Sequence, residues 1–290
     1  DMDGVIHEAI PTMTMTMTDY ILFREHYDVT DLEILDGCYF LCYPRIFDEY
    51  INKYAEIKKT SKGARRMWAK LALNSLYGKM ATNRTSSFKY AVMDNDVLKY
   101  IDIIRFDKKA GFIAVGSAIT SYARNFTIRH AQANFYGADK RGFKYADTDS
   151  LHLDLPKEEL KDIAIHPTEF NHWKVETEWD KAIFTRQKTY IEHVIKEDEV
   201  DVEPYNLIKC AGMGERCKQL IQYSLMHYTE EEWKNQHSDI WEDLNEEERK
   251  FVLQQMNMTD FKSGLYVPSK LIAKRIKGGT ILEDTTYEMR

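Results

Sequence analysis

Apolar residues recur at helical spacing in three stretches of the chain. The first stretch runs from about Ile46 to Lys59 and the second from about Ala64 to Tyr77, with turn-forming residues 60–63 between them. A repeat of three to four residues is the period of an amphipathic α-helix. The pattern therefore predicts an αα-hairpin that ends at Gly78, followed by a longer helix from about Ile113 to Tyr136.

Strand-like alternation is clearest in the second half of the chain. Residues Phe143 to Leu155 predict two strands joined by a sharp polar turn at Asp147 to Ser150. Ala182 to Ile195 and Tyr205 to Cys210 predict another strand pair, and Gly278-Gly279 between two β-rich segments predicts a hairpin. Helices and antiparallel hairpins alternate without a βαβ rhythm, so the predicted fold class is α+β.

Two regions carry no sustained pattern. Residues 1–44 mix strand-like runs at Thr12 to Thr18 and Leu32 to Tyr43 with a short helix candidate near Leu22 to His26. Residues 81–110 are polar and charged without a clear period, and they are predicted to form an exposed insertion.

The net charge of −7 is spread unevenly along the chain. Residues Thr229 to Arg249 hold nine acids and two bases, and two capping-box sequences in this block predict helix starts at Thr229 and Asn245. Residues Lys58 to Lys89 hold nine bases and no acid, and Lys262 to Lys277 hold five bases and no acid. Basic stretches of this kind suit a polyanion such as nucleic acid.

The amino-acid composition indicates which class of protein this is. The chain is 43% hydrophobic and 12% aromatic, which is typical of a folded protein. Its 4 cysteines are too few for a disulfide scaffold and are not spaced as a zinc site. No apolar run approaches the ~18 residues that a membrane span needs. These features favour a reducing, cytoplasmic setting.

Asp147 and Asp149 are the first candidates for chemistry. Carboxylates two residues apart on a strand or turn can point the same way and share a divalent cation. Mg²⁺ takes few protein carboxylates and completes its shell with phosphate oxygens, so the pair suits a nucleotide substrate. An Asp-rich turn that only bonds its own backbone is the alternative.

Two further sets of polar residues could contact phosphates. Residues at i, i+4, i+8 and i+11 line one stripe of the second predicted helix, where an exposed helix face is the alternative; these are Arg66, Lys70, Asn74 and Tyr77. The other set is spread over two elements. Arg186, Lys188 and Tyr190 alternate along a predicted strand and would share one face, while Thr120 and Arg124 lie one turn apart on the long helix.

In order along the chain, these sequences resemble the motifs of family B DNA polymerases. Lys70 to Gly78 resembles motif B (K-x3-N-S-x-Y-G), Tyr145 to Ser150 resembles motif C (Y-x-D-T-D-S), and Lys188 to Tyr190 resembles the K-x-Y motif. The protein-primed branch of phages and linear plasmids is similar in three more segments, Arg186 to Ile191, Lys209 to Met213 and Thr120-x-x-Ala123-Arg124. The resemblance extends from about Pro11 to the C-terminus.

The resemblance implies a polymerase right hand, with a partial palm, helical-hairpin fingers and a small thumb. It implies that residues 1–44 end a first insertion and that residues 45–82 form the fingers. Residues 83–110 would form a second insertion for strand displacement and processivity, and residues 111–212 would form the palm. Residues 213–290 would form the thumb, with an acidic helical insertion at about 222–258.

The resemblance also implies roles for individual residues. Asp147 and Asp149 would be catalytic and would bind two Mg²⁺ ions. Residues expected to bind the incoming nucleotide are Lys58, Arg66, Lys70, Asn74 and Tyr77. Residues expected to bind DNA and the primer are Gly78, Thr120, Arg124, Thr148, Arg186, Lys188 and Tyr190.

The implied activity is that of a DNA-directed DNA polymerase. A primer hydroxyl attacks the α-phosphate of a dNTP in line; one metal makes the hydroxyl a better nucleophile and the other stabilises the leaving pyrophosphate. The implied partners are template-primer DNA, dNTP and a terminal protein whose Ser, Thr or Tyr hydroxyl serves as the first primer. No membrane is involved, and the setting is the host cytoplasm if the chain is phage-encoded.

Two features of the family are missing. Motif A, which supplies the other essential metal carboxylate, has no match in the chain, and neither have the three exonuclease motifs. The sequence therefore predicts a C-terminal fragment or one half of a split enzyme, inactive alone. A DNA-binding remnant without catalysis and a D-x-D nucleotide-sugar transferase are the alternatives.

Overall fold

The computed structural model describes residues 8–82, 87–95, 97–104, 111–276 and 279–290. The chain divides into two compact units. Unit 1 comprises Asp1–Ser86 and Ile104–Asp162, and unit 2 comprises Ser87–Ile103 and Ile163–Arg290. Each is described by itself. Gly278 and parts of the predicted 83–110 insertion lie outside the described residues.

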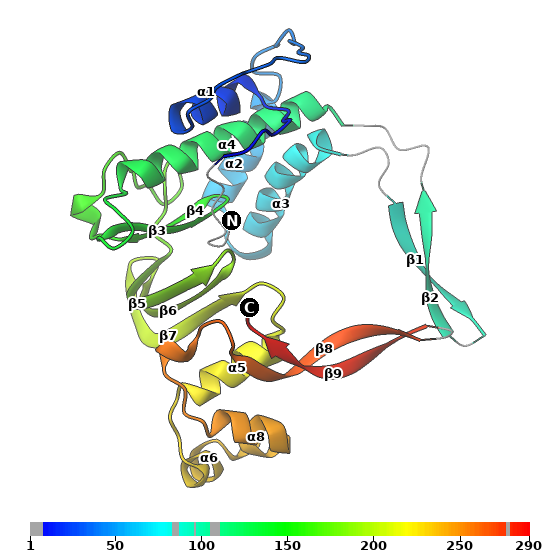
Figure 1. The fold of residues 1–290 in the computed structure, drawn as a ribbon, viewed down its shortest axis with the longest axis vertical. Helices are drawn as coiled ribbons and strands as arrows, with labels where there is room; N and C mark the ends of the chain where they lie inside the picture. Colours follow the sequence, from blue (N-terminus) through cyan, green and yellow to red (C-terminus); the bar gives the residue numbers. More distant parts are fainter. Residues whose placement is uncertain (1–7, 83–86, 96, 105–110, 277–278) are drawn as a thin grey trace. The chain divides into compact units, whose positions relative to one another are not determined.

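Unit 1 is built around its longest helix. The helices are α1 (Met17–His26), α2 (Asp48–Thr60), α3 (Gly63–Met80) and α4 (Ile113–Ala133). Helices α2 and α3 lie side by side as the predicted αα-hairpin, and the Tyr50 hydroxyl donates to the Ala72 carbonyl across it at 3.0 Å. Helix α4 contacts both α1 and α3 (Figure 1).

A β-hairpin completes unit 1. Strands β3 (Gly142–Asp147) and β4 (Ser150–Asp154) are antiparallel, with Asp147 opposite Ser150, as the sequence predicts. A short 3₁₀ helix, η1 (Lys157–Glu159), follows. Both strands contact α4, so the turn between them is presented on this helix.

Several boundaries in unit 1 differ from the prediction. Helix α3 continues through Gly78 to Met80, because one glycine inside a helix costs only about 1 kcal/mol. The predicted strand at 12–18 is wrong, since the Thr16 side chain accepts a hydrogen bond from the Asp19 backbone and starts α1. The predicted strand at 32–43 is also wrong: this segment has no regular structure and its residues are exposed.

Unit 2 contains a three-stranded antiparallel sheet in the order β5–β6–β7. Its strands are β5 (Thr177–Arg186), β6 (Thr189–Glu197) and β7 (Val200–Cys210). The predicted single strand 182–195 is therefore wrong, because the chain turns at Gln187-Lys188. Strands β1 (Ser87–Asp94) and β2 (Val97–Ile104) form a separate two-stranded sheet within the predicted insertion.

Helices and a long ribbon make up the rest of unit 2. They are α5 (Glu215–Ser224), α6 (Glu230–Gln236), α7 (Ser238–Asp243), α8 (Glu246–Val252), η2 (Met258–Asp260) and the antiparallel strands β8 (Tyr266–Ile276) and β9 (Gly279–Glu288). Both predicted capping boxes, at Thr229 and Asn245, are confirmed. Fully buried Trp233, Phe261 and Val267 lie at the centre of its hydrophobic core.

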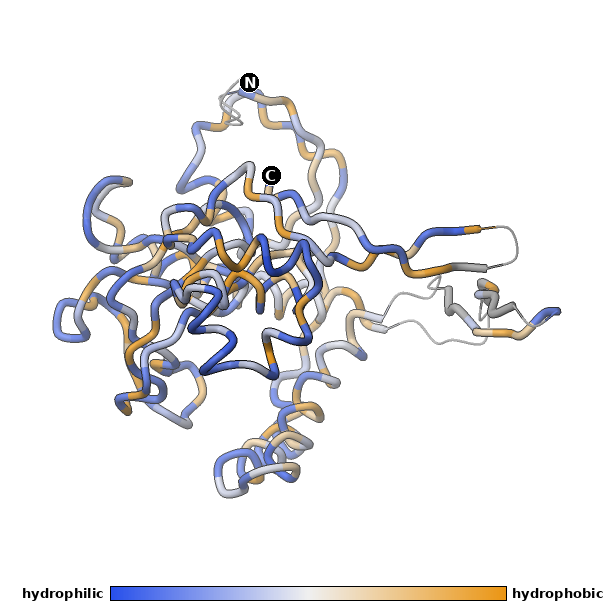
Figure 2. Tube along the Cα trace, turned by 90° about the horizontal axis from the view of Figure 1, so that it is seen from below, coloured by the Kyte–Doolittle hydropathy of each residue, from blue (hydrophilic) through white to orange (hydrophobic). Residues whose placement is uncertain are grey.

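Hydrophobic and hydrophilic positions are interspersed along the chain (Figure 2). Within the described ranges, no helix combines the length and apolar character needed to cross a bilayer.

Candidate active site

The turn between β3 and β4 displays the two predicted catalytic carboxylates. Asp147 is half-buried at the end of β3, and Asp149 is exposed in the two-residue turn. The Thr148 hydroxyl donates to a carboxylate oxygen of Asp147 at 3.1 Å, and the Ser150 hydroxyl donates to the Asp147 carbonyl at 3.1 Å. Thr148 has a φ of 54°, which is a rare left-handed conformation for a β-branched residue.

A buried threonine of α4 holds this turn. Thr127 is 7% exposed, and its hydroxyl donates to the Thr148 carbonyl at 3.0 Å. The bond fixes the tip of the hairpin directly between Asp147 and Asp149. The sequence does not identify Thr127, because a single threonine inside a helical pattern carries no local signal of a long-range partner.

The base of the same hairpin is held by the end of α4. Asn134 is fully buried, and its side chain bonds the backbone of Lys161 twice, accepting from the amide at 2.9 Å and donating to the carbonyl at 2.9 Å. Its own carbonyl accepts from the Phe143 amide at 2.8 Å. These bonds end α4 at Ala133 rather than at the predicted Tyr136. An Asn just after a helical pattern is a recognisable stop signal.

Close approach at this joint requires a glycine. Gly142 has a φ of 123°, and a Cβ at this position would lie 2.3 Å from the Asn134 carbonyl oxygen. Any side chain would therefore push β3 away from α4. The hairpin that carries the carboxylates is held at its tip and at its base by one helix.

The predicted nucleotide-binding stripe lies along α3. Its members are all exposed, as is the adjacent Gly78; they are Arg66, Lys70, Asn74 and Tyr77. Lys58 lies in the last turn of α2. Helix α4 contacts α3 closely where Gly116 faces Ala81, since a Cβ on Gly116 would be 3.1 Å from that of Ala81. Helix α4 thus contacts both the helix that carries Lys70 and the hairpin that carries Asp147.

Two predicted primer contacts on α4 have partners within unit 1. The Thr120 hydroxyl donates to the Ser117 carbonyl at 2.9 Å. Arg124 pairs with Asp19 of α1 at 2.6 Å, and the Ser121 hydroxyl donates to the other Asp19 oxygen at 2.7 Å. Burial raises the pKa of Asp19, but the bonds from Arg124 and Ser121 outweigh it and lower the pKa. Asp19 was not predicted and fixes the Arg124 side chain.

The predicted primer-binding strand in unit 2 is a turn. Lys188 has a φ of 56° between β5 and β6, and its carbonyl accepts from the Ala211 amide at 2.9 Å. Arg186 ends β5 and Tyr190 lies on β6, half-buried against Phe184. The prediction that the three residues share one strand face is wrong because the chain reverses direction between them.

The C-terminal strand braces this turn. The Tyr287 hydroxyl accepts from Arg186 at 3.3 Å and donates to the Ala211 carbonyl at 3.1 Å, and it lies 3.1 Å from the Cys210 sulfur. Burial, followed by the Cys210 contact, raises the pKa of Tyr287. Tyr287 therefore links the ends of β5 and β7, a role that no sequence motif indicates.

The hairpin carboxylates have the chemistry of partial ligands for a divalent cation. Mg²⁺ binds hard oxygen ligands and commonly takes only one or two carboxylates from the protein, with water and phosphate completing its shell. Asp147 and Asp149 at an exposed turn fit this requirement. In the part of the chain that the structure describes, no group of three or more His, Cys, Asp or Glu side chains is placed to hold a metal alone.

Known proteins resemble the chain in sequence and in fold. It is 34% identical to the DNA polymerase of Bacillus phage PZA over 228 residues, covering 74% of this chain and 39% of that protein. It is 31% identical to the DNA polymerase of Streptococcus phage Cp-1 over 278 residues, covering 95% of this chain and 41% of that protein. Phi29 DNA polymerase solved with primer-template DNA superposes with a TM-score of 0.68 at 28% identity, covering 94% of this chain and 43% of that chain.

The chain thus spans about two fifths of the length of these relatives. The fold likeness confirms the predicted α+β polymerase architecture and makes the nucleotide-sugar transferase alternative wrong. The sequence profile of organellar and viral type B DNA polymerases matches residues 8–170, more than half of the chain. The chain belongs to this family of DNA polymerases.

Proposed function

We propose that the chain provides nucleotide-addition residues of a DNA-directed DNA polymerase. One observation carries the proposal: α4 contacts the cationic helix α3 and also holds the Asp147–Asp149 turn through Thr127 and Asn134. The relative phi29 DNA polymerase has been solved with primer-template DNA and incoming nucleotide, which supports DNA and dNTP as ligands here.

The proposed reaction forms a bond between the primer 3′ oxygen and the α-phosphorus and breaks the bond to pyrophosphate. Bound Mg²⁺ would supply Lewis-acid stabilisation of both oxygens. Asp147 and Asp149 would hold it, with the Thr148 hydroxyl orienting Asp147. Cationic Lys70 and Arg66, with Lys58 on α2, would bind the triphosphate. Asn74, Tyr77 and Gly78 would lie against the base pair.

A second set of residues would hold the primer strand. We assign Thr120, Arg124, Arg186, Lys188 and Tyr190 to this role, with Asp19 and Tyr287 fixing the two arginines. In the same proposal, α2 and α3 form the fingers, residues 111–212 the palm and residues 213–290 the thumb. Two segments resemble the protein-primed branch, namely residues 186–191 and 209–213. This resemblance supports a terminal protein as the first primer. We also propose that the chain functions in the cytoplasm of the host.

Paramagnetic NMR on the isotope-labelled chain tests the metal site. Trace Mn²⁺ is expected to broaden the amide signals of residues 147–150, and the Asp147→Asn/Asp149→Asn double variant should abolish this effect. Broadening at the acidic residues Glu230 to Glu232 should persist in that variant as an internal control. Unchanged signals at 147–150 would remove the metal-binding role.

Nucleotide binding tests α3. Adding dTTP with Mg²⁺ should shift α3 signals, and Lys70→Ala should weaken this binding at least fivefold because it removes a charge on the phosphates. Lys79→Ala is the matched control, since Lys79 is exposed on the same helix but roughly 180° from the stripe at 100° per residue. Equal effects of the two substitutions would contradict the assignment.

Primer extension separates catalysis from DNA binding. The chain alone is expected to give no extension with Mg²⁺ and dNTPs, because two-metal chemistry draws carboxylates from more than one segment. In a complex with a polypeptide that carries motif A, Asp147→Asn should abolish extension. If that complex extends primers equally well with Asp147→Asn, the DNA-binding remnant is the better description. A terminal-protein partner is tested by co-purification with that complex.

A further inference from the structure

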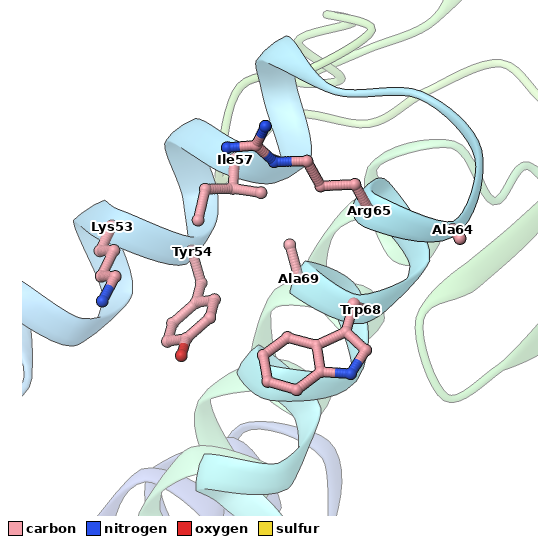
Figure 3. Close-up of a pocket in the computed structure, with 7 residues that line it drawn as sticks. All are labelled: Lys53, Tyr54, Ile57, Ala64, Arg65, Trp68 and Ala69. Atoms are coloured by element: carbon pink, nitrogen blue, oxygen red, sulfur yellow. The ribbon is translucent and has the colours of Figure 1, made fainter.

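A groove of about 510 Å³ lies between α2 and α3. Its walls are aromatic and cationic. The lining residues are Lys53, Tyr54 and Ile57 of α2 and Ala64, Arg65, Trp68 and Ala69 of α3. Figure 3 shows the Tyr54 and Trp68 rings side by side at one end of the groove, with the Arg65 side chain extended towards Ile57.

Trp68 is unusually open to solvent for its size. The residue is 66% exposed, and its ring centroid is 6.4 Å from that of Tyr54, with the ring planes tilted by 42°. One face of the indole is therefore available to a flat ligand. Stacking on an exposed aromatic ring is how proteins bind the bases of single-stranded nucleic acid without sequence preference.

The cations of the groove are available to an anion. The Lys53 ammonium lies 5.7 Å from the Tyr54 ring centroid, and Arg65 reaches over the opposite wall. Within the described part of the chain, neither side chain forms an ion pair with an acid. A phosphate on either side of a stacked base would meet a positive charge, and the surrounding run from Lys58 to Lys89 contains no acid.

The groove lies on a different face of α3 from the proposed nucleotide site. At 100° per residue, Arg65, Trp68 and Ala69 centre on a direction roughly 140° from that of Arg66, Lys70, Asn74 and Tyr77. A ligand on Trp68 therefore cannot be the triphosphate bound by Lys70.

We propose that this groove binds one or two nucleotides of single-stranded DNA. A base stacks on Trp68 beside Tyr54, and the flanking phosphates contact Arg65 and Lys53. The volume suits a ligand of this size, since small-molecule sites span ~300–1,000 Å³. The site goes beyond nucleotide addition, because it would bind an unpaired strand in the groove between α2 and α3, on a different face of α3 from Lys70.

Fluorescence anisotropy of a labelled oligo(dT) with the 290-residue chain tests the proposal. Trp68→Leu should weaken binding at least fivefold, the loss expected for one stacking contact. Lys53→Ser/Arg65→Ser should reduce the slope of log K against log salt by about 1.4, since each single-strand phosphate contact contributes ~0.7. Lys59→Ser, an exposed α2 residue outside the groove, should change neither.

An abasic deoxyribose-phosphate oligomer separates stacking from charge. The Trp68→Leu variant should bind it as tightly as the unaltered chain does, because no base is present to stack. An oligo(dT) carrying 5-iodouracil should photocrosslink to Trp68 or Tyr54. The proposal would be overturned if Trp68→Leu bound oligo(dT) with unchanged affinity, or if the crosslinks were confined to other elements. It would also be overturned if the groove bound a peptide and no DNA.

The two proposals fail separately. Lys70→Ala and the Asp147→Asn/Asp149→Asn variant should leave oligo(dT) binding through Trp68 unchanged. Loss of metal and dTTP binding with retained oligo(dT) binding would remove the nucleotide-addition role alone. Circular dichroism of Trp68→Leu should match that of the unaltered chain, because the indole is mostly exposed and contributes little to the core.

Discussion

Thr127 connects helix α4 to the turn between the two aspartates by a hydrogen bond. A β-branched residue in the left-handed region costs of order 1–3 kcal/mol and persists only where its surroundings hold it. Here the Thr127 hydroxyl holds the Thr148 carbonyl at 3.0 Å from a buried position. The strain at Thr148 is thus stabilised by a hydrogen bond from a residue of another element, helix α4.

Thr127→Val is expected to loosen this turn. Valine keeps the shape of threonine but has no hydroxyl, so the Thr148 carbonyl loses its donor at a cost of about 1 kcal/mol. Urea denaturation should report the loss, and hydrogen exchange should speed up at residues 148–150 more than at the centre of β3. Thr127→Ser keeps the hydroxyl and should behave like the unaltered chain. Equal exchange in all three proteins would contradict the role.

At the scale of elements, the sequence predicts the helices and turns whose periodicity and cap residues agree with their packing in the fold. The αα-hairpin, the β3–β4 turn and both capping boxes have periodicity or cap residues that match their surroundings. The α3 stripe and the Asp147–Asp149 turn could be predicted from the sequence for the same reason, because the residues of each lie within one element or turn.

The turn at Lys188 shows why other elements were missed. Residues 182–195 contain no Gly, Asn or Pro to mark a reversal, and lysine rarely adopts a left-handed φ. The turn is instead stabilised from outside, by the Ala211 amide and by Tyr287. Thr127, Asp19 and Tyr287 were missed for the same physical reason, since their partners lie about 20 to 105 residues away in the chain.

The acidic block contributes Trp233 to the core of unit 2, and an arginine of α5 joins the block by ion pairs. Arg216 of α5 makes a two-pronged contact with Glu248 of α8 at 2.7 and 2.8 Å, and it also reaches Asp243 at 3.0 Å. The Glu248 side chain is almost fully buried. Burial alone would raise the pKa of Glu248, but the Arg216 bonds outweigh it and lower the pKa to about 2.

Arg216→Met should destabilise unit 2 by about 2 to 3 kcal/mol, because it leaves a buried carboxylate unpaired while Arg216 itself is partly exposed. Lys250→Met is the control: its pair with Glu246 is exposed, so the expected loss is below about 0.5 kcal/mol. Urea denaturation monitored by tryptophan fluorescence measures both. Similar losses in the two variants would show that the Arg216 pair is not a stabilising joint.

The same pair makes unit 2 sensitive to acid in a defined window. The Glu248 pKa falls on folding from an ordinary value of 4.5 to about 2, so its contribution to stability is complete above pH 4.5 and is lost as the pH falls towards 2. The unaltered chain should lose stability across this window. Glu248→Gln, which does not titrate, should lose less over the same range.

At the scale of the whole molecule, the two units bury very different amounts of apolar surface. The core of unit 2 joins α5, α8, β8 and the C-terminal strand around Trp233 and Phe261. In the described part of unit 1, the buried hydrophobic residues are Leu22, Ala69 and Ala131. Large apolar side chains there are instead exposed, notably Tyr39, Phe40 and Leu41. Local stability follows buried apolar contacts, so unit 1 should open more readily.

Limited proteolysis with chymotrypsin should therefore cut unit 1 first. We expect the earliest cleavage within residues 28–47, which have almost no regular structure and expose several aromatic residues, and a resistant fragment that contains residues 205–290. Mass spectrometry of early digests identifies the sites. Cleavage by trypsin is the control, because it should follow the same order of units at different residues. First cuts within 215–265 would show that the large core does not set the order of opening.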